Sequence, residues 1–125
     1  MSSAVKTILI ADDDEDLRLL VQVTLEDPAY HIFTVEDGRQ TLDAVRQHQP
    51  DLLILDWMMP GLTGCEVMTH LRQNPETRAI PVIMLTAKDG VDAREQMAAL
   101  ALAGYLVKPF SPLELIKKVR EALDL

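Results

Sequence analysis

Three carboxylates, one hydroxyl and one ammonium group stand where short apolar runs of the chain end. Asp12 and Asp13 follow one run, Asp56 another, and Thr86 and Lys108 two more. If these runs are neighbouring strands, the three carboxylates repel one another and raise each other's pKa. A hard divalent cation relieves this repulsion, and Mg²⁺ in particular takes oxygen ligands and keeps several waters. The residues therefore predict a magnesium site.

The same residues have the chemical types that phosphoryl transfer needs. With a cation bound, the Asp56 carboxylate can act as a nucleophile toward phosphorus. Lys108 can neutralise phosphoryl oxygens, and the Thr86 hydroxyl can hydrogen-bond them. Two alternatives stay open on the residues alone. Asp56 could form a purely structural salt bridge with Lys108, and Asp12 and Asp13 could be solvated acids at a helix entry.

Five short apolar runs are the elements that would have to position these side chains. Three of them are almost continuously apolar over four or five residues, which is typical of strands covered on both faces in a parallel sheet. Sites in such sheets form at the carboxyl ends of the strands. The runs are Thr7 to Ala11, His31 to Val35, Leu52 to Leu55, Pro81 to Leu85, and Tyr105 to Val107.

Segments with apolar residues at helical spacing separate the runs, and the fourth includes Met97, Ala98 and Ala101. Thr63 with Glu66, and Ser111 with Glu114, have the spacing of capping boxes at helix starts. Strand and helix alternate throughout, so the chain is expected to be a (βα)5 α/β domain with helices on both sheet faces. We expect one domain over residues 1–125, with no output domain after the last helix.

The amino-acid composition argues against several classes of function. The net charge is -8, which argues against direct nucleic-acid binding, because that requires cations to displace phosphate counterions. The single cysteine, Cys65, permits no internal disulfide and suits the cytoplasm, and we expect its thiol to be buried and inert. No apolar stretch approaches the roughly 18 residues of a membrane span. The three histidines lack zinc-ligand spacing.

The chain resembles the receiver domain of two-component response regulators over nearly its whole length. The matching stretches, in order, are ILIADDDED, PDLLILDWMMPGLTG, IPVIMLTAKD and GYLVKPF. The resemblance implies a flavodoxin-like, doubly wound sheet of five parallel strands in the order 2-1-3-4-5. It also implies that a histidine kinase or phosphotransfer protein donates a phosphoryl group to Asp56. The protein would then be a signalling switch that catalyses only its own phosphorylation and dephosphorylation.

The resemblance assigns further roles by position. Asp13 would ligate Mg²⁺ (or Mn²⁺ in its place) directly, Asp12 largely through water, and Asp56 and the backbone carbonyl of Met58 would complete the protein ligands. Lys108 would contact the phosphoryl group.

Thr86 and Tyr105 would form a switch pair. The switch would change the face made by the fourth helix, fifth strand and fifth helix, where an effector, an output domain or a second copy of the chain would bind. The Lys108-Pro109 bond would be cis.

Three other functions, and one difference from the family's usual sequence pattern, need consideration. A phosphatase with an aspartyl intermediate would need an acid where Met58 stands, and a flavin carrier would need an uncharged phosphate loop where the chain has Asp12 to Asp16. A degenerate, unphosphorylated receiver would lack some site residue, whereas all are present.

The family often has glycine at the position of Ala101, so the fourth helix is expected to run longer here or to end differently.

Overall fold

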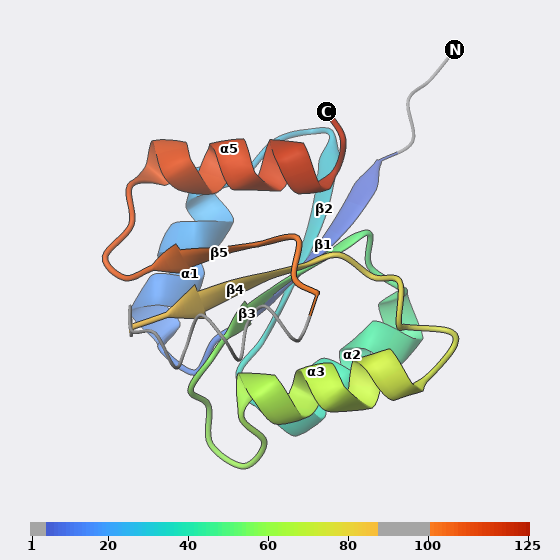
Figure 1. Ribbon diagram of the computed structural model, residues 1–125. Helices are drawn as coiled ribbons and strands as arrows, with labels where there is room; N and C mark the ends of the chain where they lie inside the picture. Colours follow the sequence, from blue (N-terminus) through green and yellow to red (C-terminus); the bar gives the residue numbers. More distant parts are fainter. Residues whose placement is uncertain (1–4, 88–100) are drawn as a thin grey trace.

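The structure is a computed structural model that describes residues 5–87 and 101–125 of the chain (Figure 1). Five strands form one sheet in the order β2-β1-β3-β4-β5, and all neighbouring pairs are parallel. This confirms the expected doubly wound topology, with β2 and β5 at the edges. The strands are β1 (Lys6–Ala11), β2 (Tyr30–Val35), β3 (Leu52–Asp56), β4 (Val82–Thr86) and β5 (Gly104–Val107).

Helices lie on both faces of the sheet. In Figure 1, α2 (Gly38–His48) and α3 (Gly64–Gln73) lie on one side of the strands, whereas α1 (Glu15–Thr24) and α5 (Pro112–Ala122) lie on the other. The fourth helix that the sequence predicts falls almost wholly outside the described residues. Within the described ranges, no helix is both long and apolar enough to cross a bilayer.

The apolar core is split into two layers by the sheet itself. Leu9, Leu53 and Leu55 belong to the layer under α2 and α3, whereas Ile8 and Ile54 belong to the layer under α1 and α5. Successive side chains of a strand point to opposite faces, so a strand covered on both sides must be apolar at every position. All five residues of β3 and all five of β4 are buried, which explains their uninterrupted apolar runs.

Local signals in the sequence form as expected. Thr63 and Glu66 make a reciprocal capping box at the start of α3, and Ser111 and Glu114 make another at the start of α5. These bonds satisfy backbone N–H groups that have no partner inside the helix. The Lys108-Pro109 bond is cis, as the family resemblance implied.

Two expectations need correction. Ala101 has a φ of 54°, in the left-handed region, so the chain does not continue as a helix through this residue. Alanine here adopts the left-handed conformation that glycine favours, and the end of the predicted fourth helix lies outside the described residues. Cys65 is half-buried and lies in the first turn of α3, not in the core.

Candidate functional site

Strand register brings the predicted site residues to one edge of the sheet. Ala11 of β1 is paired with Leu55 of β3, so the next residues, Asp12 and Asp56, lie side by side. Lys108 follows β5, and its backbone N–H donates to the Thr86 carbonyl oxygen at 2.7 Å. The sheet therefore places all four residues at the carboxyl ends of adjacent strands, where open α/β sheets form their sites.

Asp12, Asp13 and Asp56 form an acidic cluster. One carboxylate oxygen from each lies within 4.8 Å of the others. Asp12 and Asp56 are buried, whereas Asp13 is exposed and leaves the cluster open to solvent. Asp12 Oδ2 is buried with no hydrogen-bond partner in the described part of the chain. An unsatisfied buried carboxylate oxygen is costly, and an all-oxygen donor set with one open side fits a hard cation such as Mg²⁺.

Lys108 supplies positive charge to this cluster. Its Nζ donates to Asp56 Oδ1 at 3.1 Å and lies 3.7 Å from Asp12 Oδ2. The second distance is too long for a hydrogen bond, so the ammonium group is bonded to Asp56 and only near Asp12. The backbone N–H of Met58 makes a further, long contact of 3.4 Å with Asp56 Oδ1. Lys108 therefore balances part of the acidic charge.

The pKa of Asp56 is raised from its ordinary value of 3.8 to about 6. Burial of the carboxyl group is the largest cause, and the nearby charge of Asp12 acts in the same direction. The charge and hydrogen bond of Lys108 lower the pKa and offset part of this rise. Burial and a like charge both disfavour ionisation, so the site holds Asp56 ionised at neutral pH at an energetic cost.

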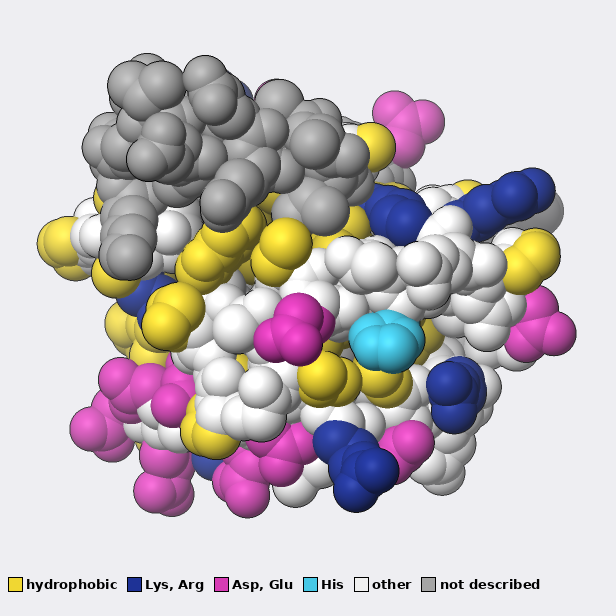
Figure 2. All heavy atoms as spheres, turned by 60° about the horizontal axis from the view of Figure 1, so that its bottom comes forward, with side chains coloured by type: hydrophobic (Ala, Val, Ile, Leu, Met, Phe, Trp, Pro, Cys, Tyr) yellow, Lys and Arg dark blue, Asp and Glu magenta, His cyan; other side chains and the backbone are white. Residues whose placement is uncertain are grey.

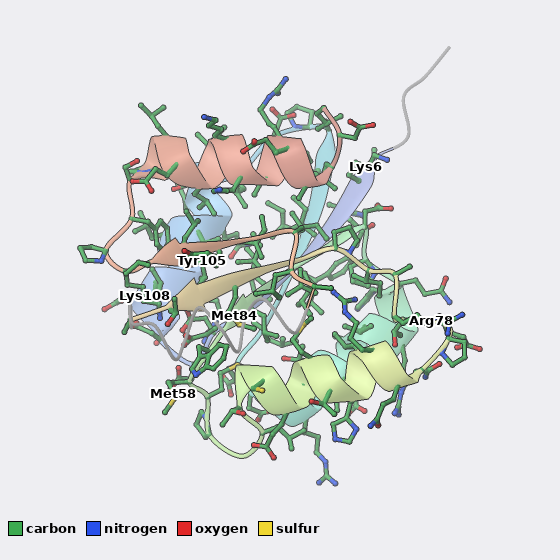
Figure 3. The ribbon with its side chains drawn as sticks, in the orientation of Figure 1. Lys6, Met58, Arg78, Met84, Tyr105 and Lys108 are labelled. Atoms are coloured by element: carbon green, nitrogen blue, oxygen red, sulfur yellow. The ribbon has the colours of Figure 1, made fainter. Side chains whose placement is uncertain are left out.

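The remaining predicted residues occupy different settings. Thr86 ends β4, is buried and reaches the same sheet edge. Tyr105 lies inside β5 and is 37% exposed, so its ring points to the surface and not into the acidic cluster. The Met58 side chain is 58% exposed. Figure 3 shows Met58 and Lys108 at the same end of the sheet, with Tyr105 further back along β5.

Acidic residues extend beyond the cluster. Asp14 caps α1 through hydrogen bonds to the N–H groups of Asp16 and Leu17, and Glu15 and Asp16 occupy the first helical turn. The helix dipole favours acidic side chains at this end of α1. In Figure 2, acidic side chains gather at the left of the view, the side to which the strands point in Figure 1.

Arg18 is a residue of this region that sequence reasoning missed. Its Nη1 donates to the backbone carbonyl oxygen of Asp12 at 2.9 Å, and its Nη2 lies 3.8 Å from Glu36 Oε2. Helical spacing would instead pair Arg18 with Asp14 or Glu15, three or four residues earlier. The sequence therefore carried a signal for a nearby acid but not for these partners.

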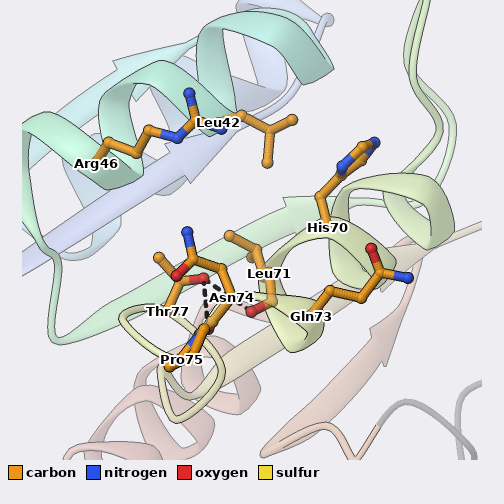
Figure 4. A pocket seen from close by; sticks show the side chains of 8 residues that line it. All are labelled: Leu42, Arg46, His70, Leu71, Gln73, Asn74, Pro75 and Thr77. Atoms are coloured by element: carbon orange, nitrogen blue, oxygen red, sulfur yellow. Dashed lines mark hydrogen bonds between the residues drawn. The ribbon is translucent and has the colours of Figure 1, made fainter.

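A separate hollow of about 330 Å³ lies between the C-terminal ends of α2 and α3, with Arg46 and His70 among its lining residues (Figure 4). Near it, the Thr77 hydroxyl lies 2.8 Å from the Leu71 carbonyl oxygen and 3.3 Å from that of Asn74. These contacts satisfy carbonyl groups at the end of α3. The hollow lies at the opposite end of α3 from Asp56 and is not part of the acidic site.

The fold and the acidic edge together define a class of protein, the doubly wound domains with a carboxylate cluster and a lysine at the carboxyl ends of the strands. Within that class, residues 8–120 match the family model described as "Response regulator receiver domain". The chain therefore belongs to the response regulator receiver family. This membership favours the receiver over the phosphatase and flavin alternatives.

Curated relatives point to the same family. The chain is 39% identical over 118 residues to the phosphate regulon transcriptional regulatory protein PhoB of Pseudomonas aeruginosa, covering 94% of this chain and 52% of the relative. It is also 39% identical to the alkaline phosphatase synthesis transcriptional regulatory protein PhoP of Bacillus subtilis, covering 94% of this chain and 48% of that protein. The chain thus spans about half the length of these relatives.

Solved structures agree with the curated relatives. The chemotaxis response regulator CheY4 of Vibrio cholerae superimposes with a TM-score of 0.88 at 32% identity. The match covers 96% of this chain and all of that one.

Proposed function

We propose that residues 1–125 form a receiver domain in which Asp56 accepts a phosphoryl group and so switches the affinity of the protein for a partner. The observation that carries this proposal is the setting of Asp56. Asp56 is only 4% exposed, its carboxylate is hydrogen-bonded to Lys108, and it lies in a cluster with Asp12 and Asp13. Receiver domains are signalling switches, so the output is binding and not a released product.

The donor that fits this site is a phosphohistidine of a sensor kinase or phosphotransfer protein. An Asp56 carboxylate oxygen attacks phosphorus and forms an O–P bond while the N–P bond breaks. The electron pair of that bond returns to the imidazole nitrogen, which takes up a proton. Lys108 would neutralise part of the charge on the three phosphoryl oxygens, and the Thr86 hydroxyl would hydrogen-bond one of them.

We further propose a divalent cation, Mg²⁺ with Mn²⁺ as a substitute, at the acidic cluster. Asp13, Asp12, Asp56 and the backbone carbonyl of Met58 are the residues that would hold it. When bound, the cation supplies positive charge that offsets the carboxylates and the phosphoryl oxygens. The unpartnered Oδ2 of Asp12 and the exposed side of the cluster support this assignment.

The switch is proposed to connect Asp56 with the surface around β5. Thr86 would move toward the phosphoryl group, and the exposed ring of Tyr105 would turn inward into the space that Thr86 leaves. The face of the fourth helix, β5 and α5 would then bind an effector, an output domain or a second copy of the chain. Of this face, residues 88–100 lie outside the described residues.

The names of the relatives suggest what the output is. PhoB and PhoP are named as transcriptional regulatory proteins, and the relative MtrA of Mycobacterium tuberculosis is named as a DNA-binding response regulator. Because the chain spans about half their length, we propose that DNA binding, if it is the output, belongs to a separate output domain or effector. We propose that the receiver works in the cytoplasm, where it meets its kinase.

Mass spectrometry after incubation with acetyl phosphate and Mg²⁺ tests the phospho-acceptor. The wild type should gain the mass of one phosphoryl group, in a bond labile to hydroxylamine. Asp56→Asn should gain none, whereas Asp43→Asn, a matched change at an exposed position of α2, should behave as the wild type. No uptake by the wild type would favour the degenerate receiver, and full uptake by Asp56→Asn would exclude Asp56 as the acceptor.

The switch is tested by amide chemical shifts with and without beryllofluoride, which stands in for the phosphoryl group. We expect shifts at Thr86, at Tyr105 and along α5. Shifts confined to the loops around Asp56 would mean that the signal does not reach this face.

A further inference from the structure

The loop between β1 and α1 carries the most exposed member of the acidic cluster, Asp13. The Asp13 carboxylate has no hydrogen bond within the part of the chain that the structure describes. Its position therefore depends on the backbone to either side. Both flanking peptide groups are hydrogen-bonded to side chains.

The two flanking peptide groups are held in different ways. The Asp14 N–H, which belongs to the peptide after Asp13, donates to Asp12 Oδ1 at 2.9 Å. The Asp12 carbonyl, which belongs to the peptide before Asp13, accepts from Arg18 Nη1 at 2.9 Å. Fixing both peptide planes fixes the direction in which the Asp13 side chain leaves the backbone, because only the two dihedrals of Asp13 lie between them.

Arg18 is largely buried, and its guanidinium has a second partner besides the Asp12 carbonyl. It lies in α1, and its side chain is only 17% exposed. Its second terminal nitrogen faces Glu36, directly after β2, at 3.8 Å. Asp12 is tied to the same strand, because its N–H donates to the Val35 carbonyl oxygen at 3.2 Å. The planar guanidinium can reach two partners at once, which the single ammonium group of lysine does less well.

We propose that Arg18 is a positioning residue for the divalent cation, because it orients Asp13 through the carbonyl of Asp12. This inference rests on the proposed metal site. Groups that orient metal ligands from behind typically change metal affinity by roughly 10- to 100-fold when they are removed. Arg18 would be such a group, acting on the backbone of the loop and not on the carboxylate itself.

The direction of the change in cation affinity on removal of Arg18 distinguishes positioning from simple electrostatics. A guanidinium repels a divalent cation, so charge alone predicts that removing Arg18 strengthens cation binding. Loss of positioning predicts the opposite, because Asp13 would have to be ordered when the cation binds. A weaker affinity after loss of a positive charge would therefore be difficult to explain without the backbone contact.

Calorimetric titration of the full chain with Mg²⁺ measures whether this affinity rises or falls. Arg18→Gln should bind Mg²⁺ about tenfold more weakly than the wild type, and Arg18→Lys should fall between the two. Arg46→Gln is the matched control, since it removes the same charge from the last turn of α2, far from the loop, and should leave the affinity almost unchanged. Thermal unfolding without metal shows whether each variant is folded.

The outcomes distinguish this inference from the proposed function. If the wild type itself binds no Mg²⁺, the metal site and this inference both fail. If the wild type binds Mg²⁺ and folded Arg18→Gln binds it equally or more tightly, the positioning role alone is wrong. Should Arg18→Gln not fold, Arg18→Lys decides, with weaker binding in support and unchanged or tighter binding against.

Discussion

Replacing Asp56 with asparagine should stabilise the metal-free protein. The carboxylate at this position is buried next to Asp12, and Lys108 offsets the resulting cost only in part. Asparagine has nearly the same shape but cannot ionise. The substitution therefore removes the charge while leaving the packing of β3 intact. A more stable variant at the proposed centre of function is the expected outcome.

The raised pKa of Asp56 sets the magnitude of the stabilisation expected from Asp56→Asn. Its rise from 3.8 to about 6 is a shift of about two units. Each unit corresponds to about 1.4 kcal/mol, so ionised Asp56 destabilises the folded protein by about 3 kcal/mol relative to a neutral group. For a domain of this size, that difference should raise the unfolding temperature by roughly 10 °C.

The pH dependence follows from the direction of the shift. A raised pKa means that the folded state holds the proton more tightly than the unfolded state does. The stability that protonated Asp56 contributes is fully present below about pH 3.8 and is lost as the pH rises through about 6. The advantage of Asp56→Asn should therefore be close to zero below pH 3.8 and reach its full size near pH 7.

Urea unfolding followed by circular dichroism, in the presence of a chelator, measures this difference across pH. Asp43→Asn at an exposed site of α2 provides the control and should change little at any pH. If Asp56→Asn is no more stable than the wild type at pH 7, or if its advantage persists unchanged at pH 3.8, the account of charge burial at this site is wrong.

Three further substitutions test other parts of the structure by thermal or urea unfolding. Ala101→Gly should stabilise the protein by about 1 kcal/mol, because it relieves a left-handed alanine, whereas Ala122→Gly at the end of α5 should not stabilise it. Ser111→Ala should cost about 1 kcal/mol through loss of the cap of α5. Gly64→Ala should destabilise and also slow phosphorylation, because a Cβ there would lie 2.7 Å from the Asp56 carbonyl oxygen; stability and uptake equal to the wild type would contradict this.

The sheet, and the site at the carboxyl ends of its strands, were predictable because the sequence patterns that indicate them are local and repeated. Uninterrupted apolar runs indicate strands covered on both faces, and strict alternation with helices indicates a parallel sheet. Once those strands are assigned, Asp12, Asp56, Thr86 and Lys108 must lie at the carboxyl end of the sheet, since each of them ends its strand or directly follows it. The strand order, in contrast, came from the family resemblance, because alternation alone leaves several orders possible.

Contacts between distant elements were less predictable. Arg18 reaches the carbonyl of Asp12 and the side chain of Glu36, and a long flexible side chain has many such partners within reach. The conformation of Ala101 was missed for a similar reason. Its carbonyl accepts a hydrogen bond of 3.3 Å from Arg72, which also holds the carbonyls of Arg78 and Ile80. Tertiary contacts of this kind can hold a residue in a conformation that its type disfavours.

The contacts of Lys108 offer a physical route by which phosphorylation of Asp56, as proposed, would act on β5. In the structure, the Lys108 ammonium group donates a hydrogen bond to Asp56, and the Lys108 backbone N–H donates one to the Thr86 carbonyl oxygen. Phosphorylation as proposed would make one Asp56 oxygen the bridging oxygen of an acyl phosphate and move the negative charge outward, so the ammonium group of Lys108 would gain new partners. Lys108 directly follows β5, the strand that carries Tyr105. A change in the partners of Lys108 would therefore act on β5. Burying most of the Tyr105 ring there would be worth roughly 1–3 kcal/mol, enough to shift the balance between two close conformers.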